Sequence, residues 1–280
     1  MDSMSPLISA TSLYQHLEQG DVAVIDCRFA LNDTSLGEKK YREAHIPGAY
    51  YAHLDNDLSS PVQPGESGRH PLPEPARLVQ TFKRFGLHDT SSVVFYDDAG
   101  GAIAARAWWL CRWLGHAQCQ VLDGGFKTWT HQQFPLSSEI PASGSGSFTK
   151  RPSLVSVAEA EQVLAPNRFL IDARDPDRYS GKHEPLDPVA GHIPGASNHP
   201  FASNLDADGR FLPADILRNN FTALIEQAAG KTLTHYCGSG VTAAHNILAM
   251  TAAELEPGEL YAGSWSEWVQ DPDRPADVRK

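Results

Sequence analysis

Residues 236–249, which read YCGSGVTAAHNILA, place a cysteine in a loop with two glycines. They overlap the end of the apolar run 232–236, which predicts a strand, and continue into an apolar-periodic stretch, which predicts a helix. A strand-to-helix turn directs several backbone N–H groups at one point, and the helix dipole adds partial positive charge there. Because such a cradle solvates a thiolate, we predict that Cys237 is a nucleophile.

The residues around Cys237 distinguish it from an ordinary buried cysteine. Most free cysteines are small core residues, which is the default interpretation of a cysteine after a strand. Gly238 and Gly240, however, allow the loop to fold tightly and bring its backbone close to a bound group. Ser239 adds a hydroxyl to the same loop. A core cysteine needs none of these features, so the local sequence favours a catalytic role for Cys237 over a role in the core.

Length and charge limit the classes of protein and partner. At 280 residues, with 20% charged and 41% hydrophobic residues, the chain is long and apolar enough for two globular domains. The formal net charge of −11 argues against nucleic acid as a partner, since phosphate binding needs a basic face. The longest apolar run is far shorter than the roughly 18 residues of a membrane span, so no membrane partner is predicted.

Cysteine usage and the first residues indicate the compartment. None of the four cysteines forms a Cys-x-x-Cys pair, and a chain of this size does not need disulfides. Residues 1–20 contain no basic patch followed by a hydrophobic run, so no secretory signal is expected. Reduced thiols and a cytoplasmic location are the prediction.

Strands alternate with helices along the first half of the chain. The apolar runs predict strands at 22–26, 92–96 and 119–122, and helices at 9–19, 74–85, 102–114 and 126–131. Residues 55–75 are rich in Pro, Gly and Ser and predict a long ordered loop, a common place for functional residues. Residues 139–152 have the composition of a linker. We therefore predict an N-terminal domain at 1–138 and a C-terminal domain at 153–280.

The second half of the chain repeats landmarks of the first half in the same order. The matched segments are 24–28 (VIDCR) with 170–174 (LIDAR), 45–49 with 192–196 (both HIPGA), 94–97 (VFYD) with 234–237 (THYC), and 124–129 (GGFKTW) with 263–268 (GSWSEW). The period far exceeds that of solenoid repeats. The repeat therefore predicts two copies of one α/β domain, each with a mostly parallel sheet covered by helices on both faces.

The two copies differ at the position of the nucleophile. Where the second copy has Cys237, the first has Asp97, and a carboxylate cannot be the sulfur nucleophile. We therefore predict that the C-terminal domain is catalytic. The N-terminal domain becomes a structural partner that supplies one wall of a cleft.

Other repeated residues are interpreted structurally. His45 and His192 each precede Ile-Pro-Gly-Ala and lack a second ligand at helical spacing, so they are predicted to fix a turn, not to bind a metal. The acidic and basic residues of 26–28 and 172–174 are predicted to form buried ion pairs at strand ends. The tryptophans of 108–113 are predicted to lie in a helix core, and no cofactor is predicted.

Two rival functions use a cysteine in such a loop. A cysteine-dependent phosphatase needs an arginine after five intervening residues, but that position is Ala243. A sulfur-relay module that takes sulfur from a protein persulfide stays open.

The paired HIPGA runs, the degenerate first loop and the CGSGVT loop resemble the tandem-domain rhodanese family over nearly the whole chain. The loop is more similar to 3-mercaptopyruvate sulfurtransferases than to thiosulfate rhodaneses, which typically carry Arg and Lys at the positions of Gly238 and Ser239. The resemblance implies that Cys237 takes a sulfur from 3-mercaptopyruvate, releases pyruvate, and passes the persulfide sulfur to cyanide or to a thiol such as thioredoxin or a small dithiol. Transfer from thiosulfate is the alternative.

The resemblance also implies site residues. Ser239 would act with His70 and Asp55, because a carboxylate can orient an imidazole that exchanges a proton with a hydroxyl. The alternatives are that Asp55 is a surface acid with Asp57 in its role, that His70 is an exposed loop residue, and that Ser239 bonds its own turn. The implied substrate-binding loop comprises Gly238, Gly240, Val241 and Thr242.

A substrate carboxylate needs a cation, and the resemblance implies Arg178 for this role. The alternative for Arg178 is an ion pair with Asp175 or Asp177. The chain departs from the animal mercaptopyruvate enzymes where these have a second arginine, because it has Asp187 there. We expect weaker holding of a carboxylate than two arginines would give, and activity on both donors stays open.

Overall fold

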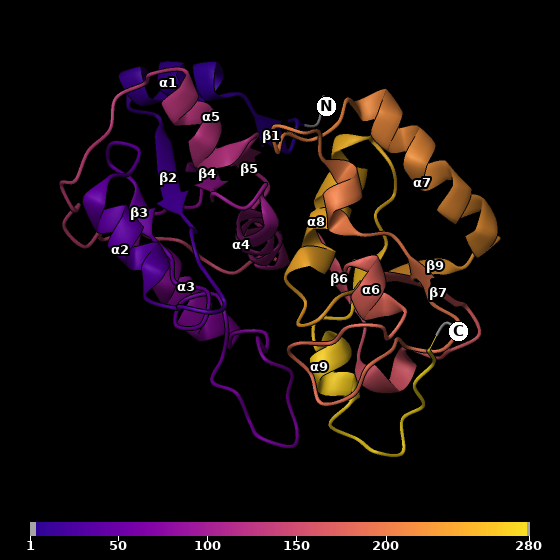
Figure 1. Ribbon diagram of the computed structural model, residues 1–280. Helices are drawn as coiled ribbons and strands as arrows, with labels where there is room; N and C mark the ends of the chain where they lie inside the picture. Colours follow the sequence, from indigo (N-terminus) through magenta and orange to yellow (C-terminus); the bar gives the residue numbers. More distant parts are fainter. Residues whose placement is uncertain (1–3, 279–280) are drawn as a thin grey trace. The chain divides into compact units, whose positions relative to one another are not determined.

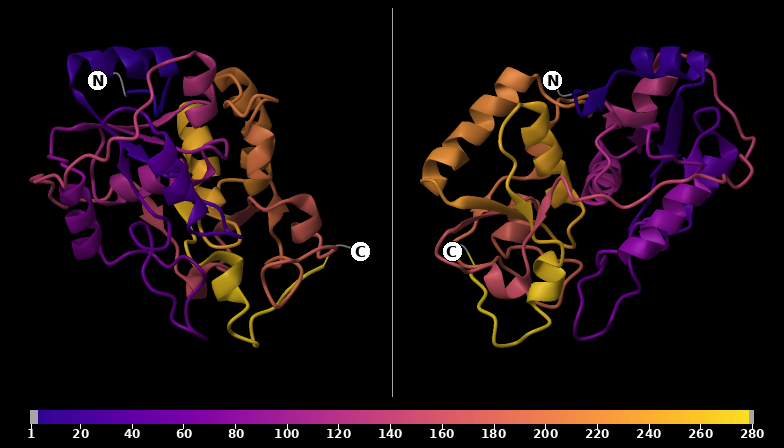
Figure 2. Two further views of the ribbon diagram at one scale, coloured as in Figure 1. Left: turned by 60° about the vertical axis from the view of Figure 1, so that its left-hand side comes forward. Right: turned by 180° about the vertical axis from the view of Figure 1, so that it is seen from behind.

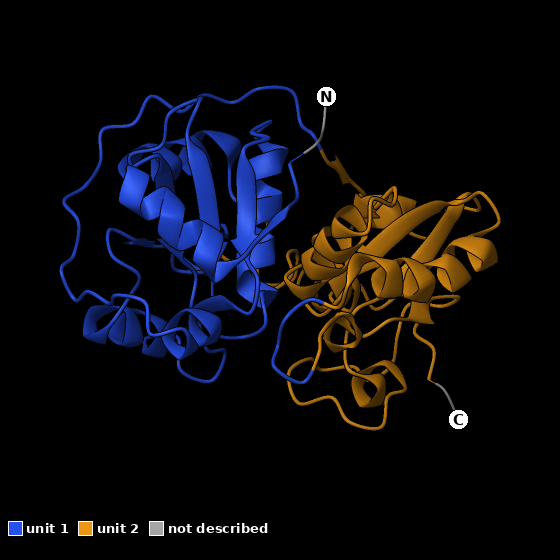
Figure 3. Cartoon of the chain, turned by 90° about the horizontal axis from the view of Figure 1, so that it is seen from above, with its two compact units in different colours: residues 1–60, 73–154, 207–211 blue, residues 61–72, 155–206, 212–280 orange. Residues whose placement is uncertain are grey.

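The protein, described by a computed structural model over residues 4–278, divides into two compact units (Figure 3). Unit 1 comprises residues 1–60, 73–154 and 207–211, and unit 2 comprises residues 61–72, 155–206 and 212–280. Segment 61–72, which carries His70, therefore groups with the C-terminal half of the chain. The predicted domain limits at 138 and 153 stay a prediction.

Unit 1 contains one parallel sheet of five strands, in the order β1-β5-β4-β2-β3 (Figure 1). Its strands are β1 (Leu7–Ile8), β2 (Val22–Asp26), β3 (Tyr50–Tyr51), β4 (Ser92–Tyr96) and β5 (Cys119–Leu122). Its helices are α1 (Ala10–Gln19), α2 (Leu36–Glu43), α3 (Pro75–Arg84), α4 (Ala102–Trp113) and α5 (Gly125–His131).

Alternation along the central strand β4 explains why helices cover both faces of this sheet. Val94 belongs to a core cluster with Leu13 of α1 and Trp129 of α5. Phe95 points to the opposite face, as the next residue of a strand must, and its ring lies 6.5 Å from that of Phe82 in α3. A strand that is apolar on both faces must be covered on both, which explains its continuous apolar run.

Unit 2 repeats this topology with the strand order β6-β10-β9-β7-β8, again all parallel. Its strands are β6 (Ser156–Val157), β7 (Arg168–Asp172), β8 (Ser197–Asn198), β9 (Thr232–Tyr236) and β10 (Glu259–Leu260). Its helices are α6 (Pro176–Tyr179), α7 (Ala214–Ala228), α8 (Thr242–Ala252) and α9 (Ser264–Trp268), with 3₁₀ turns at Ala160–Gln162 and Phe201–Asn204. Helices α7 and α8 pack together, as both views of Figure 2 show. The predicted fold of two α/β domains with parallel sheets is confirmed.

The first helix and its neighbouring strand lie where the sequence predicts them. Ser9 caps α1 by accepting a hydrogen bond from the N–H of Ser12 at 3.0 Å, and Gly20 ends the helix with φ 71°. Strand β2 has the predicted bounds. No helix within residues 4–278 combines the length and apolar character needed to cross a membrane.

The repeated acidic–basic pairs are buried ion pairs at the ends of β2 and β7, as predicted. In each pair the arginine Nη2 lies 2.6 Å from a carboxylate oxygen, between Arg28 and Asp26 in unit 1 and between Arg174 and Asp172 in unit 2. The repeated histidines fix turns, since Nδ1 of His45 donates to the carbonyl of Tyr41 at 2.7 Å.

Candidate active site

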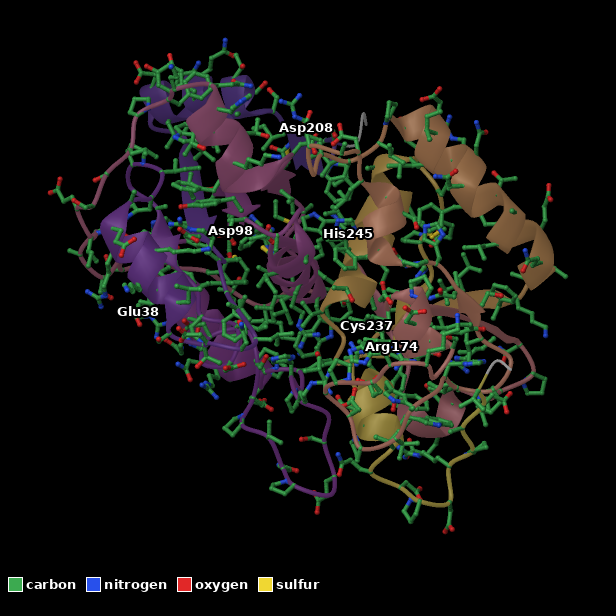
Figure 4. All side chains as sticks on the ribbon, viewed as in Figure 1. Glu38, Asp98, Arg174, Asp208, Cys237 and His245 are labelled. Carbon is green, nitrogen blue, oxygen red and sulfur yellow. The ribbon has the colours of Figure 1, made fainter. Side chains whose placement is uncertain are left out.

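The loop that begins at Cys237 lies between β9 and α8 and is held by the start of α9. The N–H of Trp265 donates to the carbonyl of Cys237 at 3.0 Å, and the N–H of Ser266 donates to the carbonyl of Gly238 at 2.9 Å. Gly240 has φ 73°, and a β-carbon there would collide with the carbonyl oxygen of Ala262. The loop therefore needs glycine at 240 both for its backbone conformation and for space. Cys237 is labelled in Figure 4, within unit 2.

The equivalent loop of unit 1 shows that this fold builds an anion cradle. One oxygen of the Asp97 carboxylate accepts the N–H groups of Ala99 and Gly101, each at 2.8 Å. The other oxygen accepts the N–H groups of Ile103 and Ala104 at 2.8 and 2.9 Å. Burial raises the pKa of the Asp97 carboxyl group, and these four backbone hydrogen bonds at a helix start oppose that rise.

Cys237 holds the same position in unit 2, and its sulfur receives the corresponding donors. Burial would raise the pKa of Cys237, but hydrogen bonds from the hydroxyl of Thr242 and from the N–H groups of Ser239 and Ala243 outweigh it, so the pKa is lowered. The N–H groups of 239 and 243 stand two and six residues after the nucleophile position, as those of 99 and 103 do in unit 1. Although Cys237 is only 2% exposed, its sulfur therefore lies among hydrogen-bond donors that favour the thiolate form.

Ser264 supports the backbone of the cysteine. Its hydroxyl accepts the N–H of Cys237 at 3.0 Å and donates to the carbonyl of Tyr261 at 2.9 Å. Ser264 does so with φ 56°, whereas Gly125 has φ 55° at the equivalent place in unit 1. A left-handed backbone conformation disfavours residues with a β-carbon, so this serine keeps a side chain where glycine would be less strained. Nothing in the sequence pattern marks this contact.

Segment 61–72 brings His70 to the loop. The N–H of Arg69 donates to the hydroxyl of Ser266 at 3.0 Å, which fixes the segment on α9. Nδ1 of His70 lies 2.7 Å from the hydroxyl oxygen of Ser239, within hydrogen-bond distance, and both side chains are buried. This geometry differs from both alternatives, an exposed His70 and a Ser239 bonded only to its own turn.

Asp55 belongs to unit 1, so its pairing with His70 stays a prediction. Its backbone N–H donates to Nδ1 of His53 at 3.1 Å. The alternative acid, Asp57, accepts a hydrogen bond from the N–H of His53 at 2.9 Å and forms an ion pair with Arg84. Asp57 thus has partners of its own within unit 1.

Arg178 lies at the loop, but its ion-pair partners differ from the alternative considered from the sequence. It pairs with Glu184 at 2.8 Å and with Asp187 at 3.0 Å, not with Asp175 or Asp177. The reason is geometric: α6 is a single turn, and the chain after it folds back so that residues 184–187 face the guanidinium group.

A second guanidinium group, that of Arg69, also lies at the loop. A β-carbon at position 238 would be 2.7 Å from Nη2 of Arg69 and 3.3 Å from Nη1 of Arg178. The sequence predicts one arginine here and the structure brings two, because segment 61–72 groups with unit 2. The signal that could have revealed Arg69 is its position next to His70 in a loop already singled out as functional.

The remaining loop residues act through the backbone and through Thr242. Val241 is buried, and its carbonyl accepts the N–H of Ala244 at 3.1 Å as α8 begins. Across residues 4–278, no group of three His, Cys, Asp or Glu side chains is arranged to hold a metal ion.

Comparisons with known proteins agree with this geometry. The rhodanese-like domain profile matches residues 9–132 and 156–271. A Pseudomonas aeruginosa protein named "Probable 3-mercaptopyruvate sulfurtransferase" is 46% identical over 278 residues, which cover 98% of each chain. The chicken thiosulfate sulfurtransferase is 30% identical over 274 residues, which cover 94% of this chain and 92% of the relative. The solved 3-mercaptopyruvate sulfurtransferase of Leishmania major superposes with a TM-score of 0.80 at 30% identity, over 96% of this chain and 75% of that one.

Two matched domains, full-length relatives and a cysteine in the anion cradle of the second domain all lead to the same conclusion. The chain belongs to the family of proteins built from rhodanese-like domains.

Proposed function

We propose that this protein is a sulfurtransferase that takes a sulfur atom from 3-mercaptopyruvate onto Cys237 and passes it to a thiol or to cyanide. The observation that carries the proposal is the position of the Cys237 sulfur, which receives hydrogen bonds where the equivalent loop holds the Asp97 carboxylate. A site that solvates a thiolate also solvates the persulfide anion that replaces it. Relatives named 3-mercaptopyruvate sulfurtransferase support this choice of donor.

The transfer step balances without a cofactor. The Cys237 thiolate attacks the donor sulfur, an S–S bond forms, and the C–S bond breaks with its electron pair moving to carbon. The products are a cysteine persulfide and the enolate of pyruvate, which takes up a proton to become pyruvate. The proton released when the persulfide ionises equals the proton that the enolate needs, so net charge is conserved.

Ser239 and His70 are the groups we assign to this proton transfer. Their 2.7 Å contact links a hydroxyl next to Cys237 with an imidazole, a common general acid–base group. We retain Asp55 as the proposed orienting carboxylate. The guanidinium groups of Arg178 and Arg69 flank Gly238 and would hold the donor carboxylate.

The second half of the reaction returns the enzyme to its starting state. An acceptor thiolate attacks the outer sulfur of the persulfide, which forms the acceptor persulfide and releases the Cys237 thiolate. Thioredoxin or a small dithiol suits this step, since a second thiol can then release the sulfur as sulfide. A reducing compartment such as the cytoplasm, which we propose as the location, keeps Cys237 in the required state.

Thiosulfate is the second candidate donor, because guanidinium groups also bind small dianions. Two cations beside the nucleophile suit a small dianion as well as a carboxylate. With thiosulfate, sulfite would leave with the electrons of the S–S bond, and no carbon would need a proton.

The test is direct detection of sulfur on Cys237. Wild-type protein incubated with 3-mercaptopyruvate should gain the mass of one sulfur atom on the peptide that contains Cys237 and release one pyruvate per site. Cys237→Ser should do neither and should keep the wild-type circular dichroism spectrum. Sulfur gained by the serine variant, or found on another cysteine, would contradict the proposal.

Cys27→Ala is the matched control. Cys27 is also a buried cysteine just after a strand, but burial and the nearby carboxylates of Asp26 and Asp97 raise its pKa well above the usual value. This variant should still load sulfur on Cys237.

A further inference from the structure

Six charged side chains of unit 2 form one chain of alternating sign that ends at the Cys237 loop. In order they are Asp172, Arg174, Glu184, Arg178, Asp187 and Arg69. The successive N–O distances are 2.6, 3.3, 2.8 and 3.0 Å, and the last contact joins Nη1 of Arg69 to Asp187. The cluster contains three positive and three negative groups, so its formal net charge is zero.

Asp187 is the only carboxylate of this chain of charges that bonds to both guanidinium groups at the loop. One of its oxygens accepts from Arg69 and the other accepts from Arg178. The Asp187 side chain is 3% exposed, whereas Arg178 is 16% and Arg69 is 28% exposed. Asp187 therefore holds the two arginines from their buried side.

Both guanidinium groups bind carboxylates and also lie close to Gly238. Arg69 binds Asp187 through Nη1, and Arg178 binds its two carboxylates through Nε and Nη2. A β-carbon at position 238 would lie 2.7 Å from Nη2 of Arg69, and 3.3 and 3.4 Å from Nη1 and Nη2 of Arg178. Both guanidinium groups thus reach the space above Gly238 while they stay bound to Asp187.

We propose that Asp187 determines donor selectivity, by cancelling charge on Arg69 and Arg178 so that a monoanionic carboxylate donor is favoured over dianionic thiosulfate. The inference rests on the proposed function and deepens it. Asp187 acts through the two arginines and is a positioning residue for the donor, not a group that touches the reacting sulfur.

The charge on the donor determines how much its binding changes when the negative charge of Asp187 is removed. Removing one negative charge from the cluster strengthens the binding of every anion, and the gain scales with the charge of that anion. At separations of several ångströms and an intermediate effective dielectric, Coulomb's law gives about tenfold for each unit of donor charge. Asp187→Asn should therefore raise the ratio of kcat/KM for thiosulfate to that for mercaptopyruvate about tenfold, mainly through KM.

Lowering the pH should shift the donor selectivity of the wild-type protein in the same direction as Asp187→Asn does. Burial raises the pKa of Asp187 above its usual value, although Arg69, Arg178 and Arg174 oppose this, and the carboxylate of Glu184 adds to the rise. As the pH falls through that raised pKa, Asp187 loses its charge and the selectivity ratio should move toward thiosulfate. The asparagine variant has no such carboxylate, so this part of the pH profile should be absent from it.

The experiment measures kcat/KM for both donors with cyanide as acceptor, in wild-type protein and three variants. The first is Asp187→Asn, with the expected tenfold change in ratio. The second is Asp187→Asn combined with Arg69→Gln, which restores the net charge of the cluster and should return the ratio toward the wild-type value. If Asp187 had only a structural role, the double variant should lose more activity with both donors, and its kcat/KM ratio should not return toward the wild-type value.

The third variant, Asp177→Asn, is the matched control, because its carboxylate lies on α6 beside Arg178 but is 62% exposed and pairs with Lys182. It should leave the ratio unchanged. An unchanged ratio in Asp187→Asn, or an equal change in Asp177→Asn, would overturn the inference. These results differ from failure of the proposed function, in which wild-type protein would load no sulfur on Cys237 from either donor.

Discussion

Replacing Thr242 by valine removes one hydrogen bond to the Cys237 sulfur while keeping the shape of the side chain. After the opposing effect of burial, the hydroxyl of Thr242 is the largest contribution to the pKa of Cys237, and it lowers that pKa. Thr242 is the first residue of α8, and valine has a similar helix propensity. The expected result is a higher pKa for Cys237 in an otherwise intact loop.

The size of the increase follows from the kind of hydrogen bond. A hydrogen bond to a charged group contributes about 1.5–3 kcal/mol, and one pKa unit corresponds to about 1.4 kcal/mol. Thr242→Val should therefore raise the pKa of Cys237 by about one to two units. A thiolate of higher pKa is also intrinsically more nucleophilic, by about threefold for each pKa unit.

The higher pKa lowers the thiolate fraction, whereas the higher nucleophilicity raises the reactivity of each thiolate. These two effects oppose each other, so the change in rate depends on pH. Below both pKa values, the rate of reaction of Cys237 with a small disulfide such as 2-hydroxyethyl disulfide should fall about three- to fourfold for each unit by which the pKa rises. Above both values, the plateau rate should rise by about threefold for each such unit. Mass spectrometry assigns the modified residue, and burial raises the pKa of Cys27 and of Cys111 well above the usual value, which separates their reactions from that of Cys237.

Thr251→Val is the control for this experiment. Thr251 lies on the same helix, and its hydroxyl donates to the carbonyl of Ile247 at 2.8 Å, away from the sulfur. Its pH profile should match that of the wild-type protein. A profile for Thr242→Val that also matches the wild type would refute the hydrogen-bond account of the lowered pKa.

Two further substitutions test the proton relay and the framework. Ser239→Ala should lower mercaptopyruvate turnover by about 10²–10⁴-fold while thiosulfate:cyanide transfer survives, because only the enolate needs a proton; equal losses with both donors would remove that role. Asp172→Asn should lower the free energy of unfolding by about 3–5 kcal/mol in urea titrations, because it leaves the buried guanidinium group of Arg174 without its closest partner. A loss no larger than that of the exposed Asp177→Asn would show that the pair adds little to stability.

Much of the fold could be predicted because its signals are local. The strands 22–26 and 92–96 are continuous apolar runs, as strands buried on both faces must be. Ser9 and Gly20 mark the ends of α1 through capping and a left-handed turn, both of which depend on single residues. Because the two halves of the chain share matched segments, the elements predicted in the first half also indicated the fold of the second half.

The parts of the site that escaped prediction depend on contacts between distant residues. Arg69 and Asp187 are 118 positions apart, and they meet because segment 61–72 binds the start of α9. No periodicity or composition marks such a pair. Ser264 escaped for a related reason, since its left-handed conformation is visible only once the loop of Cys237 is folded over it.

The two nucleophile positions show why the repeat is so visible although only one copy carries a cysteine. A buried carboxylate without hydrogen bonds would be very costly, so Asp97 requires the same ring of N–H groups that lowers the pKa of Cys237. Replacing the cysteine by an aspartate removes the ability to transfer sulfur. The aspartate side chain still needs the hydrogen-bond donors that a helix start and a tight turn provide. The backbone of the loop is therefore retained in unit 1, where it holds a carboxyl group that cannot transfer sulfur.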